Sequence, residues 1–134
     1  MAQQPRNGLV AGFALGVAIA FFFAVVIRFI PADWLLNPVT RAWLYAAQVP
    51  AGLLFIPVAT AVARARSASP RHVLLWACCG ALAFDGLVLG FWPGLYGQEG
   101  IARTMIATLL LWAFAWIVAA ALLFAPDDEG SARG

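Results

Sequence analysis

Asp85 is the residue whose type and position could do chemistry in this chain. It is the one charged residue inside four long apolar stretches, which cover residues 9–27, 42–63, 73–96 and 104–125. A carboxylate buried in a bilayer at this depth costs about 2.5–3.5 kcal/mol on insertion scales. We therefore expect Asp85 to face other helices and to have a partner.

Arg28, near the end of the first stretch, is the best candidate for that partner. If both segments are helices, the two residues are offset by ~9 Å along the helix axes, which a long arginine side chain can largely cover. Arg41 and Arg103 are the alternatives. The sequence thus predicts an intramembrane polar pair of Asp85 and Arg28.

Two roles are open for Asp85. In one, it is the titrating group of a proton- or ion-coupled site. In the other, its bond to a neighbouring side chain holds helices together. The residues that would share its helix face favour the structural role, because they are apolar and offer no water-filled path: Cys78, Ala81, Leu82, Val88 and Leu89.

The other reactive side chains form no catalytic or metal-binding set. Cys78 and Cys79 are adjacent, so on a helix they project about 100° apart and are badly placed for a disulfide with each other. His72 is the only histidine, which leaves haem without a second axial histidine and a metal without a ligand set. We expect no enzyme, no metal and no cofactor.

These residues must be positioned by membrane-spanning helices. Hydrophobic residues make up 64% of the 134-residue chain and charged residues 10%, which excludes an ordinary soluble domain. An apolar helix of about 20 residues spans ~30 Å, the thickness of a bilayer's hydrocarbon core. The sequence predicts an all-α membrane protein, a four-transmembrane-helix bundle in a single domain (1–134), with helices at about 8–30, 42–64, 72–92 and 103–125 and a flexible acidic tail at 126–134.

Small residues recur at every fourth position of the first helix and form a flat stripe on one face. Helix backbones in membranes approach closely along such stripes. Gly86 and Gly90 make a shorter version in the third helix. Both patterns predict close helix packing, either inside the bundle or against a second copy or another protein; the longer stripe comprises Gly8, Gly12, Gly16, Ala20 and Ala24.

The second helix contains Pro50 and Pro57, which are seven residues apart and therefore lie on nearly the same face. Each proline removes an amide donor and clashes with the carbonyl four residues back, so we expect a kink there. Gln48 lies close enough to satisfy a freed carbonyl. The kinks are either structural, as is common in membrane helices, or part of a transport movement.

Aromatic side chains mark one end of the expected helices. Trp34, Trp43, Trp92 and Tyr96 are typical of interfacial anchors, whose amphipathic rings lie at the level of the lipid headgroups.

Trp112 and Trp116 lie instead near the middle of the fourth helix, four residues apart on one face. An indole N–H at that depth needs an acceptor. We expect this face to meet protein or, alternatively, to bind a pigment, lipid or quinone.

The arginines indicate the orientation, because short cytoplasmic loops carry an excess of basic residues. With the N-terminus inside, five arginines are cytoplasmic and three are external, so we expect both termini in the cytoplasm. A cleaved signal peptide is the alternative for the first segment, but its apolar run is too long. The cytoplasmic set is Arg6, Arg64, Arg66, Arg71 and Arg133, and the external set is Arg28, Arg41 and Arg103.

The two external loops match at a separation of 62 residues. This spacing predicts two tandem helical hairpins related by an axis along the membrane normal, with a chance match as the alternative. The matched residues are Phe29, Pro31, Trp34 and Arg41 with Phe91, Pro93, Tyr96 and Arg103.

Three short motifs carry a family resemblance: Arg28-Phe29, residues 85–96 and residues 110–114. With these motifs the chain resembles an uncharacterised family of small bacterial four-helix membrane proteins, catalogued as a domain of unknown function. The resemblance implies the fold and a bacterial inner membrane, and it supplies no activity.

We therefore expect a structural or interaction role, as an accessory subunit of a larger membrane complex or as a homo-oligomer. The expected partners are the lipid bilayer and other membrane-protein subunits or a second copy. The net charge of +2 and the lack of a basic run argue against nucleic acid. The alternative is a small transporter or ion-conducting oligomer that uses Asp85 as its titrating group.

Overall fold

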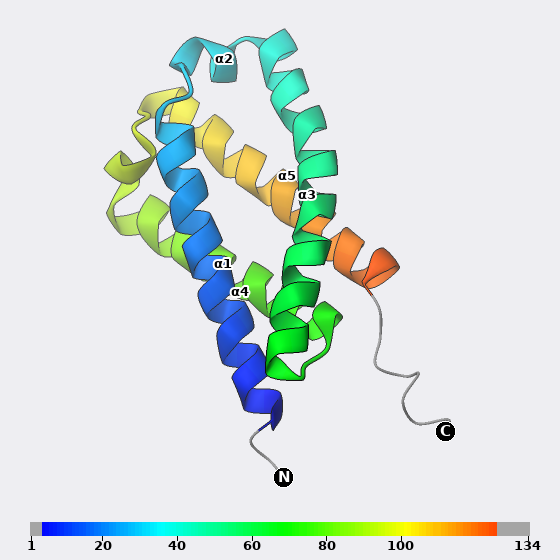
Figure 1. Ribbon diagram of the computed structural model, residues 1–134. Coiled ribbons are helices and arrows are strands. Elements are labelled where there is room, and N and C mark those ends of the chain that lie inside the picture. The colour runs from blue at the N-terminus through cyan, green and yellow to red at the C-terminus, as the bar shows by residue number, and fades with distance from the viewer. Residues whose placement is uncertain (1–3, 126–134) are drawn as a thin grey trace.

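The computed structural model describes residues 4–125, and most of these residues are helical. No strand occurs within this range. The elements are α1 (Gln4–Arg28), α2 (Ala32–Leu36), α3 (Pro38–Arg66), α4 (Pro70–Phe91), the 3-10 helix η1 (Pro93–Tyr96) and α5 (Gly100–Phe124), as Figure 1 shows.

The four long helices, α1, α3, α4 and α5, are each long and apolar enough to cross a membrane. This finding confirms the predicted all-α fold with four apolar helices. All four begin earlier than the sequence predicted, at residues 4, 38, 70 and 100 instead of 8, 42, 72 and 103. The short helices α2 and η1, in the two connections at one end of the bundle, were not predicted.

Proline explains the earlier starts of α3 and α4, and a capping side chain supports the start of α3. Pro38 is the first residue of α3, where the missing amide donor would have had no helical partner. The Asn37 side chain accepts hydrogen bonds from the backbone amides of Val39 (2.9 Å) and Thr40 (3.4 Å). Pro70 begins α4 in the same position. At their first residues, α3 and α4 therefore extend past the apolar stretches from which the predicted bounds came.

The contact between α1 and α4 brings the two backbones together. A Cβ atom on Gly12 would lie 2.7 Å from the carbonyl oxygen of Val73, and one on Gly16 would overlap the carbonyl of Ala77. The paired residue numbers rise together, so the two helices run in the same direction. Close van der Waals contact of this kind is what holds helices together in lipid.

The rest of the stripe also lies inside the protein. Gly8 faces Ala68 in the turn between α3 and α4, where a Cβ atom would lie 2.5 Å from the Ala68 Cβ. Ala20 and Ala24 are buried further along α1. The stripe is thus used within the chain, the first of the two predicted alternatives.

On α4 the packing differs from the prediction. The glycine that faces α1 is Gly80, whose added Cβ atom would overlap the carbonyl of Phe13. Gly86 and Gly90 are exposed, and an added Cβ atom would meet nothing within 4 Å. Gly86 is six residues after Gly80, about 240° around the helix, so it faces away from α1. The prediction that Gly86 and Gly90 pack inside the bundle is therefore wrong.

Helices α3 and α5 complete the bundle. α3 packs against α5 and part of α4, whereas α1 and α3 meet near the end that carries the N-terminus and spread apart toward α2 (Figure 1). An exact duplication would exchange α1 with α4 and α3 with α5, so that α1 would contact α5 as much as α4 contacts α3. No comparable contact exists between α1 and α5. The helix contacts therefore do not follow an exact duplication, and a looser relation between two tandem hairpins stays a prediction.

Helix α3 continues as one helix of 29 residues through Pro50 and Pro57. Both prolines lie on its exposed side. On that side, the backbone carbonyl that each proline leaves without an amide donor faces away from the bundle. The predicted kinks stay predictions.

Replacing Gly16 by alanine should destabilise the fold, because the new methyl group would overlap the Ala77 carbonyl. Overpacking of this kind costs about 1–3 kcal/mol, which should lower the melting temperature in detergent by several degrees. Gly86→Ala is the matched control: its methyl group meets nothing, and alanine favours a helix interior by about 1 kcal/mol over glycine. Equal losses in both variants would contradict the α1–α4 contact.

Candidate functional site

Asp85 lies near the end of α4 that leads to η1, and its side chain is buried, with 5% exposed. Its partner is Tyr96, whose hydroxyl group donates a hydrogen bond to Asp85 Oδ1. Tyr96 is the last residue of η1 and is 0% exposed. The polar partner expected for Asp85 therefore exists, but it comes from an element that was not predicted.

Arg28 does not serve as that partner. It is the last residue of α1 and is exposed, and no ion pair joins it to Asp85 within residues 4–125. Its aliphatic stem lies against Gly97, where a Cβ atom would be 2.7 Å from Arg28 Cγ. The predicted Asp85–Arg28 pair is wrong, because the chain after α4 folds back and places a neutral donor beside the carboxyl group.

The assignment of Tyr96 as an interfacial anchor is also wrong. Its ring is packed in a buried cluster with Ala24, Leu35 and Val88. A phenol can bury its ring fully where its hydroxyl group finds a partner inside the protein, as it does at Asp85. The remaining predicted anchors are exposed, and their contact with lipid headgroups stays a prediction: Trp34, Trp43 and Trp92.

Burial raises the pKa of Tyr96, and the hydrogen bond and charge of Asp85 raise this pKa further. Since the ordinary pKa of tyrosine is already about 10, the phenol stays protonated at neutral pH. Tyr96 is thus held in its hydrogen-bond donor form.

A second bond fastens the same segment to the connection between α1 and α2. The Gln98 side-chain amide donates to the Ile30 carbonyl at 2.7 Å, and the Gln98 carbonyl accepts from Arg103 Nε at 3.2 Å. Gln98 is buried. Tyr96 and Gln98 therefore tie residues 96–98 to α4 and to the connection between α1 and α2. The Asp85 site as a whole joins three parts of the chain.

Trp112 in α5 has a partner in the protein. Its Nε1 donates to the backbone carbonyl of Tyr45 in α3 at 3.0 Å, and the Tyr45 hydroxyl donates to Thr108 Oγ1 at 2.9 Å. The rings of Trp112 and Trp116 pack edge to face, with centroids 5.7 Å apart. Of the alternatives predicted for this face, contact with protein is therefore present for Trp112.

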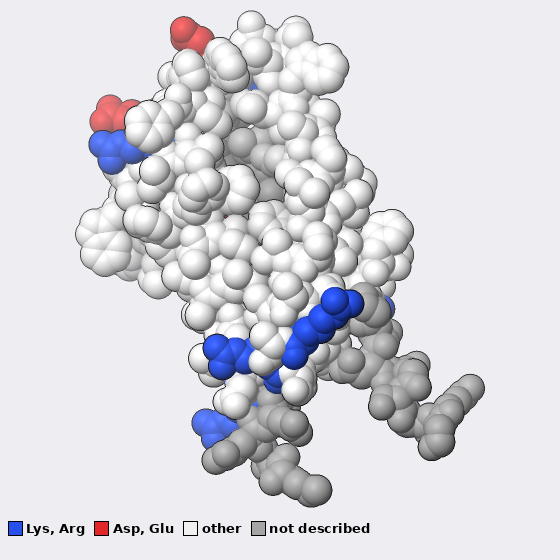
Figure 2. Space-filling model, in the orientation of Figure 1, with Lys and Arg blue, Asp and Glu red and all other residues white. Residues whose placement is uncertain are grey.

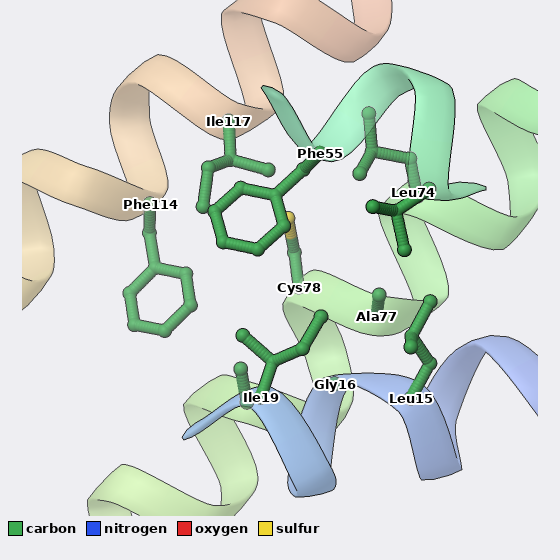
Figure 3. Close-up of a pocket in the computed structure, with 11 residues that line it drawn as sticks. Leu15, Gly16, Ile19, Phe55, Leu74, Ala77, Cys78, Phe114 and Ile117 are labelled. Carbon is green, nitrogen blue, oxygen red and sulfur yellow. The ribbon is translucent and has the colours of Figure 1, made fainter. Parts of the chain in front are cut away.

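An apolar cavity of about 30 Å³ lies between all four long helices (Figure 3). Ile19 of α1 lies across it from Phe55 of α3, Phe114 of α5 lies at one side, and Cys78 of α4 also lines it. Its lining residues are uncharged, and Asp85 is not one of them. A water-sized space of this kind offers an ion no ligands.

Nothing in the described part of the chain forms a metal site, since no three His, Cys, Asp or Glu residues come together there.

Gln48 is a polar residue inside α3. Its Oε1 is buried and has no hydrogen-bond partner among residues 4–125. No bond from its amide to a carbonyl freed by Pro50 is found there either.

The sequence contains a signal for the contact between Tyr96 and Asp85, although the hydrophobic pattern did not predict this contact. Tyr96 follows Asp85 by eleven residues, which in a continuous helix would separate them by about 16 Å. Pro93 and Gly94 come between them and are unsuited to a helix interior. The break lets the chain turn back, but its direction depends on packing against α1 and α5.

Comparison with protein-family models, with curated proteins and with solved structures finds no match to this chain. The resemblance to a family of small bacterial membrane proteins therefore stays an expectation from the sequence.

Tyr96→Phe should destabilise the protein by about 1–3 kcal/mol, because it leaves a buried carboxyl group without its donor. Asp85→Asn should cost less, since the amide oxygen still accepts a hydrogen bond. Arg28→Ala, at an exposed position, should change stability by less than about 0.5 kcal/mol. Thermal unfolding in detergent measures all three.

A double-mutant cycle of Tyr96→Phe and Asp85→Leu should show a coupling of about 0.5–3 kcal/mol. Simple additivity in this cycle, or a large loss in Arg28→Ala, would contradict the assignment of Tyr96 as the partner.

Gln48→Leu should stabilise the protein by about 1 kcal/mol, since it removes a buried acceptor that has no hydrogen-bond partner among residues 4–125. Thr60→Val is a useful comparison, because the Thr60 hydroxyl already donates to the Ile56 carbonyl at 2.8 Å. A lower melting temperature for Gln48→Leu would mean that the amide is engaged in an interaction that stabilises the fold.

Proposed function

We propose that this chain is an integral membrane protein with an interaction role, either as an accessory subunit of a larger complex or as a homo-oligomer. Four long apolar helices support its place in a membrane. The excess of arginine at the end that carries the N-terminus supports a cytoplasmic location for both termini. The proposed location in a bacterial inner membrane rests on the resemblance of the sequence to a family of small bacterial membrane proteins.

The observation that carries the interaction role is a face of α4 whose two glycines point into open space among residues 4–125. Gly86 and Gly90 lie on this face in open space. Cys79 and Ala83 are exposed on the same side, within about 60° of Gly86 around the helix. We call these four residues the outward glycine face. On one side of Gly86 these small side chains leave room for the backbone of another helix, and the exposed Leu82 borders the face on the other side.

A helix outside the chain would pack on this face for the same physical reason that α1 packs on α4. Lipid tails solvate apolar side chains as well as protein does, so helices associate where their backbones approach closely enough for dense van der Waals contact. The chain uses Gly16 and Gly80 in this way for α1 and α4. The outward glycine face offers the same chemistry to a helix outside the chain.

The transport alternative has one observation in its favour, the buried position of Asp85 within α4. The bond from Tyr96 weakens that argument, since it gives the carboxyl group a structural partner. The cavity between the helices has an uncharged lining that does not include Asp85. We therefore propose the interaction role over transport and over an enzymatic role.

The test is the variant Gly86→Leu, Gly90→Leu. Leucine side chains at these positions project into open space, so the fold and its melting temperature should be kept. Association through the outward glycine face should be lost, because two leucines hold a facing backbone apart. In native membranes, the variant should no longer co-purify with the partner of the wild-type chain, or should run as a monomer in mild detergent.

Cysteine oxidation gives a second measurement if the partner is another copy. Cys79 is exposed, whereas Cys78 is buried, so oxidation should link copies through Cys79 alone. Cys79→Ser should abolish the covalent dimer and Cys78→Ser should leave it. A wild-type chain that is monomeric and has no partner at native expression would overturn the interaction role.

A further inference from the structure

The end of the molecule that carries the N-terminus is strongly basic. Arg6 lies in the first turns of α1, and Arg64 and Arg66 lie in the last turn of α3; all three are exposed. Figure 2 shows arginine side chains gathered over this end of the molecule.

These arginines come from segments that are in contact. Gly8, two residues after Arg6, faces Ala68, two residues after Arg66. Arg71 belongs to the same end, where its guanidinium donates to the Leu122 carbonyl (3.2 Å) and the Ala125 carbonyl (3.4 Å) at the end of α5. Because Arg71 is already engaged, we call the exposed Arg6, Arg64 and Arg66 the basic end.

The carboxylates of the described residues lie elsewhere. Asp33 belongs to α2, Asp85 is bonded to Tyr96, and Glu99 precedes α5. The acidic side chains visible in Figure 2 are at the end opposite the basic end. Within residues 4–125, the basic end therefore has no carboxylate to neutralise it.

We propose that the basic end binds the phosphate groups of anionic phospholipids in the leaflet that surrounds it. A guanidinium group matches phosphate oxygens with two parallel N–H donors, and arginine remains charged at any physiological pH. Because the apolar helices α1 and α3 continue directly from Arg6 and Arg66, the arginines lie where a bilayer has its headgroups. Basic side chains at this level attract anionic lipids.

The competing occupant is the chain's own acidic segment, which contains Asp127, Asp128 and Glu129 and lies outside the described residues. The side chains of residues 126–134 carry a net charge of −2, because Arg133 offsets one carboxylate. The three arginines of the basic end exceed this charge. The surplus of positive charge favours lipid phosphate as the partner.

The experiment compares thermal unfolding of the full chain in phosphatidylcholine vesicles and in vesicles of equal parts phosphatidylcholine and phosphatidylglycerol. The wild-type protein should melt at a higher temperature in the anionic vesicles. Arg64→Gln, Arg66→Gln should lose most of this gain, since it removes two of the three arginines. High salt should reduce the gain further, because exposed charges are screened.

Arg28→Gln, at the opposite end, is the control for Arg64→Gln, since each variant removes one exposed arginine. Arg28→Gln should reduce the gain less than Arg64→Gln does, because the exposed Asp33 and Glu99 offset the positive charge at the opposite end. Melting in pure phosphatidylcholine shows whether any variant is unstable for another reason. Equal melting of the wild-type chain in both vesicles, or an equal loss in both single variants, would overturn the proposal.

Neutralising the acidic segment with Asp127→Asn, Asp128→Asn, Glu129→Gln separates the two occupants. If lipid binds the basic end, this variant should gain at least as much stability from phosphatidylglycerol as the wild-type chain does. If the arginines pair with the acidic segment instead, the variant should lose stability in pure phosphatidylcholine while the wild-type chain shows no preference for anionic vesicles, and the proposal fails.

Discussion

The approach of the α1 backbone to the α4 backbone is the constraint on which the rest of the structure depends. In a lipid environment, burial of leucine or phenylalanine adds little to helix association, so contact density decides which helices meet. Gly12, Gly16 and Gly80 allow that density, because any side chain there would overlap the facing backbone. Once these faces are paired, the rotation of α4 about its axis is set. Asp85 then falls inside and Gly86 outside.

The end of the bundle with α2 and η1 is closed by hydrogen bonds rather than by glycine contacts. Tyr96 donates to Asp85, Gln98 donates to the Ile30 carbonyl, and Arg41 donates to the Leu35 carbonyl at 3.1 Å. Buried polar groups in an apolar protein are costly unless they are paired. At this end each of these groups is paired within the chain, so a carboxyl group in α4 can contribute to the fold without any role in transport.

The two ends of the bundle therefore differ in their chemistry, and so do the two faces of α4. One end is closed by neutral hydrogen bonds, and the other presents arginines. One face of α4 is filled by α1, and the other presents glycines to the surroundings. This asymmetry fits a small protein that orients itself in a bilayer through its basic end and meets another helix through α4. The interior, with its uncharged cavity, has no evident part in such a role.

The sequence by itself determined the number and type of the long helices, because an apolar run of sufficient length has few other stable forms in a membrane. It also determined that residues 8–24 of α1 form a packing face, since the period of four is a local property of a helix. Only the tertiary structure decided that Gly80 rather than Gly86 meets α1, and that Tyr96 rather than Arg28 meets Asp85. Both outcomes depend on the rotation of one helix against another and on the direction in which the chain turns after Pro93. Those quantities are set by contacts between distant residues, which no local pattern records.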